Sequence, residues 1–138
     1  MLKDDDKIIL AVNGTLMRGF PLEKNMIEAK ATFLCDAKTE KAYRLYSIND
    51  SNPAMIRVSR DDQNASEIDV ELWEVPPDGL AKILANEPEG LTIGKVKLND
   101  GKVVFGVVGE YELVRGMKEI TKYGGWRNYL LDKKGFNK

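Results

Sequence analysis

The segment that follows the first apolar run of the chain has the residue types of an anion-binding turn. Residues 13–19 read Asn-Gly-Thr-Leu-Met-Arg-Gly and come directly after the run Ile-Ile-Leu-Ala-Val. A glycine has no side chain, so it lets the chain turn sharply and lets a carboxylate approach backbone N–H groups. An ordinary strand-to-helix turn has the same pattern, and the residues alone leave both interpretations open. The candidate ligand-binding residues are Asn13, Gly14, Thr15, Leu16, Met17 and Arg18, the last through a two-pronged guanidinium contact.

Two carboxylates stand two residues apart in Glu87-Pro88-Glu89-Gly90. One of them would act as a general base if burial raised its pKa towards the working pH. A solvated loop that exposes both glutamates is the alternative. The chain contains no histidine, which excludes Ser-His and Cys-His nucleophiles, imidazole metal sites and a histidine base. Proton transfer would therefore fall to carboxylates, lysines, tyrosines or water.

Two further groups of residues have both a structural and a functional interpretation. Glu67, Asp69 and Glu71 alternate along one strand face, where a solvent-facing edge is favoured over a metal site. Tyr123 opens the segment Tyr-Gly-Gly-Trp-Arg, whose aromatic residues either pack in the core or line a pocket. We take Tyr123 as a further candidate for substrate binding, and we predict neither a metal site nor a cofactor.

The composition is that of one folded domain without a strong electrostatic preference. The chain has 138 residues, with 21 Lys and Arg against 22 Asp and Glu, so its formal charge is −1. This balance favours neither nucleic acid nor a membrane surface as a partner. No apolar stretch has the length of a transmembrane span or a signal peptide, so we expect a cytoplasmic protein. Cys35, the only cysteine, lies in an apolar run and is predicted to be a small buried hydrophobe.

Short strands dominate the pattern and must position the candidate residues. Alternating or apolar runs predict seven strands, at 7–12, 32–36, 42–48, 54–58, 66–75, 93–98 and 102–108. Helical spacing predicts short helices at 21–31, at 79–85 with Asp78 as N-cap, and at 110–117, and an amphipathic segment from Tyr123. This order favours an α+β class with a mixed, mostly antiparallel sheet curled into a small barrel with short flanking helices. We expect a single domain at 8–131, a flexible tail at 1–7 and a polar tail at 132–138.

An ordered set of short segments resembles a known superfamily. The loop at 12–19 is similar to the Tyr-Gly-Ser/Thr-Leu loop of γ-glutamylcyclotransferase-like proteins. Five later segments resemble the C-terminal domain of allophanate hydrolase. They are Tyr-Arg-Leu-Tyr-Ser-Ile at 43–48, Pro-Ala-Met-Ile-Arg-Val at 53–58, Val-Glu-Leu-Trp-Glu-Val-Pro at 70–76, Ile-Gly-Lys-Val at 93–96, and the stretch 120–130.

The resemblance implies a γ-glutamylcyclotransferase-like fold with its cavity beside the first loop. In the cyclotransferases, loop N–H groups hold the substrate carboxylate and a glutamate serves as base while 5-oxoproline is released. By motif the loop corresponds to residues 13–16 and the base to Glu89, with Glu87 as the near alternative. Two departures weaken the likeness to a cyclotransferase. Asn13 replaces the loop tyrosine, and the segment around Pro88 resembles the proline-rich stretch of the allophanate hydrolase domain, which lacks that glutamate.

Two functions follow from this resemblance. The first is a small-molecule enzyme with cyclotransferase-like or decarboxylase-like activity on a carboxylated amide, a carbamate or a γ-glutamyl compound. The second is a non-catalytic ligand-binding or assembly module that partners an amidase or other hydrolase. The allophanate hydrolase domain normally follows an amidase, whose signature this chain lacks. A homodimer is a third expectation, because a domain that usually packs on another often keeps an apolar face.

Overall fold

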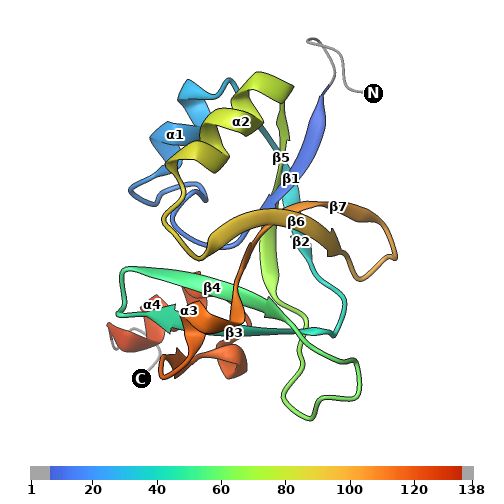
Figure 1. Ribbon diagram of the computed structural model, residues 1–138, viewed down its shortest axis with the longest axis vertical. Helices are drawn as coiled ribbons and strands as arrows, with labels where there is room; N and C mark the ends of the chain where they lie inside the picture. The colour runs from blue at the N-terminus through green and yellow to red at the C-terminus, as the bar shows by residue number, and fades with distance from the viewer. Residues whose placement is uncertain (1–6, 135–138) are drawn as a thin grey trace.

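The computed structural model describes residues 7–134 and forms two curled sheets with short helices around them (Figure 1). The larger sheet has the strand order β2-β5-β1-β7-β6. Its strands are β1 (Ile8–Val12), β2 (Thr32–Lys38), β5 (Asp69–Val75), β6 (Leu91–Lys97) and β7 (Val103–Gly109). β1 pairs antiparallel with β5 and parallel with β7, and the other neighbours in this sheet are antiparallel. Because β1 is the central strand, the loop that follows it begins between β5 and β7.

The smaller sheet has the order β4-β3-β8 and packs against β7 through β4. Its strands are β3 (Tyr43–Ile48), β4 (Asn52–Arg57) and β8 (Lys118–Glu119). The helices α1 (Glu23–Glu28) and α2 (Pro77–Asn86) lie side by side at one end of the molecule in Figure 1. The helices α3 (Tyr111–Val114) and α4 (Trp126–Lys133) lie by the smaller sheet, and a 3₁₀ turn spans Thr121–Tyr123. The predicted α+β class with mostly antiparallel pairing is confirmed, although the sheets curl without closing into a barrel.

The apolar run of β1 is continuous because both faces of the strand are covered. Leu10 and Val12 point into the main core, whereas Ala11 belongs to a smaller apolar cluster on the opposite face of the sheet. Trp126 and Tyr129 of α4 complete the main core from the far end of the chain and are almost fully buried. Of the two interpretations of these aromatic residues, the structure places Trp126 and Tyr129 in the core, and Trp126 also borders a hollow.

Several element boundaries differ from the sequence-based expectations. β8 was not predicted, because two residues are too short to show a period. The N-cap of α2 is Pro76, and Asp78 lies inside the first turn. Prolines such as Pro76 and Pro77 suit the start of a helix, because the first N–H groups of a helix have no intrahelical partner. The last helix continues through Lys133, into the segment expected to be a polar tail. The remaining residues of the two expected tails, 1–6 and 135–138, lie outside the described residues.

Two burial predictions are wrong, and both concern the strand pair β2 and β5. Glu71 is 1% exposed, although the alternation of β5 predicts a solvent-facing position. β5 lies between β2 and β1, and buried apolar side chains lie on both of its faces, so the middle of the strand, where Glu71 stands, has no solvent side. Cys35 is exposed rather than buried, because β2 is the edge strand of the sheet.

The turn between β3 and β4 anchors the last helix, and this anchor predicts a pH-dependent stability. Asp50 accepts hydrogen bonds from Ser47 Oγ (2.6 Å), Tyr129 Oη (2.6 Å) and Lys133 Nζ (2.7 Å). The bond from Lys133, followed by those from Ser47 and Tyr129, lowers the pKa of Asp50 well below its ordinary value. A lowered pKa means that this stabilisation is complete above about pH 4 and is lost as pH falls through the folded-state pKa.

We therefore expect Asp50→Asn to lower the melting temperature at neutral pH, with a difference from wild type that shrinks as the solution is acidified. Thermal melts followed by circular dichroism between about pH 2 and 7 measure this difference. Asp61→Asn, at an exposed position of the next turn, is the matched control and should melt like wild type. A difference for Asp50→Asn that does not change with pH would contradict the ion-pair account.

Candidate functional site

Asn13 leaves β1 with its side chain buried under the neighbouring strand. Its Nδ2 donates a hydrogen bond to the backbone oxygen of Val107 at 3.0 Å. This bond ties the start of the loop to β7, on the side of β1 opposite β5. Because Nδ2 is occupied, Oδ1 is the atom of Asn13 that remains to accept a hydrogen bond from a ligand.

Gly14 is required by close packing rather than by an unusual backbone angle. A Cβ atom at this position would lie 2.4 Å from Cδ and 2.5 Å from Cγ of Pro53, well inside van der Waals contact. Its φ is not positive, unlike that of Gly19. The loop backbone therefore rests directly on the ring of Pro53 at the beginning of β4.

The loop presents consecutive N–H groups without backbone partners. Within residues 7–134, the N–H groups of Gly14, Thr15 and Leu16 reach no backbone carbonyl. The turn is closed instead by the N–H of Met17, which donates to Gly14 O at 3.0 Å, and by that of Leu22, which donates to Thr15 O at 3.0 Å. Successive unpaired N–H groups in a turn form a concavity that favours a negatively charged atom.

A hollow of about 300 Å³ lies against this loop. Its walls are mostly apolar, and its polar members come from the loop, from the turn before β4 and from the end of α2. The residues that line it are Val12, Asn13, Gly14, Thr15, Leu16, Pro21, Leu22, Ser51, Asn52, Pro53, Glu87, Pro88, Leu91 and Val107. Glu87 is the only ionisable side chain in this set, which contains neither lysine nor arginine.

Glu87 reaches the hollow because α2 ends there. Its backbone is extended (φ −74°, ψ 142°), and its N–H still donates to Leu84 O at 3.2 Å. Pro88 prevents the helix from continuing, since the residue before a proline avoids the helical region. Burial raises the pKa of the Glu87 carboxyl above its ordinary value. Glu89 is exposed and does not line the hollow.

Three of the candidate binding residues are directed elsewhere. Arg18 donates from Nε to Glu71 at 3.1 Å and from Nη2 to Asp36 at 3.0 Å, so its guanidinium is used behind the loop. Met17 is packed in the main core. Tyr123 stacks edge-on against Tyr129, with ring centroids 5.2 Å apart, and lines a different hollow. The partner Glu71 of Arg18 lies 53 residues away in the sequence, so local pattern carried no signal for it.

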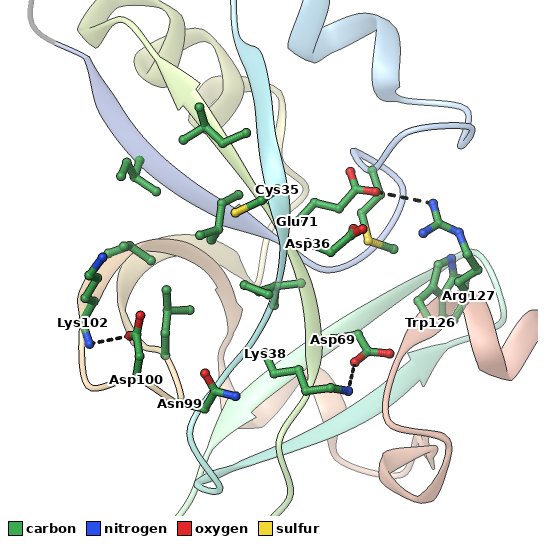
Figure 2. Close-up of a pocket in the computed structure, with 18 of the residues that line it drawn as sticks. Cys35, Asp36, Lys38, Asp69, Glu71, Asn99, Asp100, Lys102, Trp126 and Arg127 are labelled. Carbon is green, nitrogen blue, oxygen red and sulfur yellow. Dashed lines mark hydrogen bonds and ion pairs between the residues drawn. The ribbon is translucent and has the colours of Figure 1, made fainter.

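A second hollow, of about 850 Å³, borders the edge strand β2 (Figure 2). Figure 2 shows Glu71 and Arg127 as a close pair, with Nη2 of Arg127 3.6 Å from Oε2 of Glu71. Its labelled polar residues are Asp36, Lys38, Asp69, Glu71, Asn99, Asp100, Lys102 and Arg127. Sequence reasoning assigned Glu71 to solvent. One signal in the sequence did indicate burial of Glu71: this acid stands between Val70 and Leu72, in a strand rich in apolar residues.

No helix among residues 7–134 combines the length and the apolar character needed to cross a bilayer. Within the same residues, no three Cys, Asp or Glu side chains gather in a way that could hold a metal ion.

Comparison with known proteins places these features in a family. The family model of the allophanate hydrolase C-terminal domain matches residues 8–131. Urea amidolyase of Saccharomyces cerevisiae is 36% identical over 127 residues, which are 89% of this chain but 7% of that protein. The chain thus spans a small fraction of the length of the curated relatives it matches.

Solved structures agree with this assignment. A protein described as specific to uropathogenic Escherichia coli is 47% identical, with a TM-score of 0.86 over 91% of this chain and 96% of that chain. Kluyveromyces lactis allophanate hydrolase is 33% identical, with a TM-score of 0.84 over 91% of this chain and 21% of that chain. A γ-glutamyl cyclotransferase shares the fold at 13% identity and a TM-score of 0.51. The chain belongs to the allophanate hydrolase C-terminal domain family and has a γ-glutamylcyclotransferase-like fold.

Proposed function

We propose that this chain is a small-molecule enzyme that binds a carboxylate-bearing amide, carbamate or γ-glutamyl compound in the hollow beside residues 13–16. The observation that supports it most is the meeting of two separate segments in one hollow. N–H groups that reach no backbone carbonyl among residues 7–134 come from the loop after β1, and a carboxyl group with a raised pKa comes from the end of α2. A group of this kind, placed beside an anion site, suits a general base.

The roles of the residues follow from their hydrogen-bonding capacity. The N–H groups of Gly14, Thr15 and Leu16 hold the carboxylate, and Glu87 takes a proton from an N–H of the bound molecule. Oδ1 of Asn13 accepts a second N–H from the ligand. Glu87 takes the base role because Glu89 lies outside the hollow.

The charges in the hollow restrict the ligand. Among the residues that the structure describes, the lining contains no lysine or arginine, so none of them offers a cation to offset the negative charges of a bound carboxylate and of Glu87. Like charges that share a site disfavour each other. The proposed ligand therefore carries one negative charge and several N–H groups, and the volume of about 300 Å³ keeps it small.

Because two negative charges would share the hollow, acetate binding should weaken as pH rises. Glu87 has a raised pKa, so it is protonated at low pH and becomes a competing anion as pH rises through that pKa. The affinity is measured between about pH 4 and 8 by titration of backbone amide NMR signals, with the acetate concentration at each pH corrected for the fraction that is ionised. Glu87→Gln should remove the pH dependence and Glu89→Gln should keep it. Acetate affinity that does not vary with pH in the wild type would contradict the prediction.

Turnover is tested by incubating the protein with γ-glutamyl amines and with N-carboxylated ureas, and by assaying 5-oxoproline and carbon dioxide. Release of either product by the wild type, together with its loss in Glu87→Gln, supports the enzyme function. Absence of turnover on both substrate classes would count against it.

A second function, a binding or assembly module for an amidase, is favoured by one specific observation. The matching segment makes up only 7% of the yeast urea amidolyase and 21% of the Kluyveromyces lactis allophanate hydrolase chain, so these two relatives carry this domain attached to much more protein. Purification of the tagged chain from its source, with identification of co-purifying proteins, tests this function. Recovery of an amidase would support it, whereas a monomer with measurable turnover would contradict it.

A further inference from the structure

We infer that Glu71 is a positioning residue that holds the ligand-binding loop in place from behind, an inference that rests on the proposed function. Glu71 lies on β5, is 1% exposed, and lines the second hollow rather than the one beside residues 13–16. It therefore acts on the ligand only through the loop.

The carboxylate of Glu71 accepts a hydrogen bond from a backbone N–H at the far end of the loop. Oε1 accepts the backbone N–H of Arg18 at 2.9 Å and Nε1 of Trp73 at 3.2 Å. Oε2 accepts Nε of Arg18 at 3.1 Å. A bond to a main-chain N–H fixes the path of the chain itself, whatever the side chain at that position does.

Arg127 completes the arrangement from α4. Its Nη2 donates to the backbone oxygen of Arg18 at 2.7 Å and lies 3.6 Å from Oε2 of Glu71, the contact drawn in Figure 2. The residue Arg18 is thus held by its N–H on one side and by its C=O on the other. Hydrogen bonds with an ionised partner are about twice as strong as neutral ones.

This clamp lies next to the turn that presents the unpaired N–H groups. Met17, the neighbour of Arg18, donates the N–H that closes the turn onto Gly14 O. The other end of the loop is fixed by the bond from Asn13 to Val107. With both ends fixed, the N–H groups of residues 14–16 keep their directions before any ligand arrives, which reduces the ordering cost of binding.

The main alternative is that Glu71 only stabilises the fold. A buried carboxylate is a weak source of stability, because the cost of removing it from water offsets much of what its ion pairs contribute. A positioning role predicts a local effect at the loop, whereas a purely structural role predicts an effect spread over the whole core. Acetate affinity and local hydrogen exchange therefore distinguish the two roles.

The test compares Glu71→Gln and Arg127→Met with the control Asp69→Asn. Asp69 lies two positions from Glu71 on the same strand and borders the same hollow, but its side chain pairs with Lys38 and Asn128 rather than with the loop. Arg127→Met removes one side of the clamp without leaving a buried charge alone, so it remains informative if Glu71→Gln fails to fold. Two quantities are measured by NMR: the Kd for acetate, and hydrogen exchange at the N–H groups of Met17 and Leu10.

We expect Glu71→Gln to weaken acetate binding by about tenfold, because N–H groups that are no longer held in place must be ordered when the ligand binds. Exchange at Met17 should accelerate while exchange at Leu10 in β1 stays near the wild-type rate, and Arg127→Met should show the same pattern to a smaller degree. Wild-type Kd and wild-type exchange at Met17 in a folded Glu71→Gln protein would overturn the inference, as would equal acceleration at Met17 and Leu10. If the wild type itself does not bind acetate, the proposed function fails, and the exchange rates alone decide the positioning role.

Discussion

Replacing Glu87 with glutamine lowers turnover by about 10²–10⁴-fold, the range for loss of a positioned general base. The substitution keeps the shape of the side chain and removes its ability to accept a proton. The anion-binding N–H groups belong to a different segment and stay in place, so the fall should appear in kcat. KM should stay the same or decrease, because Glu87→Gln also removes the negative charge that repels the bound carboxylate. Steady-state release of 5-oxoproline or carbon dioxide measures both constants.

Glu89→Gln is the matched control for this prediction. It makes the same chemical change two residues further along the chain, at an exposed position outside the hollow. Its turnover should equal that of the wild type. If Glu89→Gln abolished turnover and Glu87→Gln did not, the assignment of the base would be reversed. Unchanged turnover in both variants would exclude either glutamate as the base.

Gly14→Ala should close the ligand site and destabilise the protein by about 1–3 kcal/mol, as is typical of an added methyl group in a tightly packed place. The new Cβ would stand 2.4 Å from Cδ of Pro53, so either the loop or the start of β4 has to move. Both line the hollow, and either shift displaces the N–H groups that bind the carboxylate. Urea unfolding measures the change in stability, and acetate titration measures the loss of binding.

A second substitution distinguishes this steric cause from a backbone effect. Pro53→Ala removes the two ring atoms that the new methyl group would strike. The double variant Gly14→Ala/Pro53→Ala should therefore be more stable than the sum of the two single changes predicts, and it should recover part of the acetate affinity. Strict additivity of the two substitutions would show that the Gly14–Pro53 contact is not the cause.

Those parts of the fold that depend on local pattern could be predicted from the sequence. The apolar run of β1, the alternation of β3 and the turn residues Asn99-Asp100-Gly101 between β6 and β7 each carry their own signal. The order of strands in the sheets carries no such signal. Cys35 was assigned to the interior and Glu71 to solvent because alternation alone does not reveal which strand is an edge and which is central.

The candidate site shows the same division between local and long-range information. The turn after β1 was recognisable from Asn13 and Gly14, and a carboxylate near Pro88 was recognisable from its motif. The choice between Glu87 and Glu89 depends on where α2 ends relative to a loop more than 70 residues earlier in the chain. Arg18 was expected to face the ligand, but its partner Glu71 comes from a strand that only the folded sheet brings near.

The central claim is that the loop after β1 and Glu87 together form a carboxylate-binding site. The most direct measurement is a titration of the labelled protein with 5-oxoproline, which carries both a carboxylate and an N–H, followed in two-dimensional amide NMR spectra. The account predicts that the largest shifts occur at Gly14, Thr15 and Leu16, with smaller ones at Glu87, and that Glu87→Gln alters the affinity. Absence of shifts at the loop, or shifts confined to the second hollow around Asp69, would contradict it.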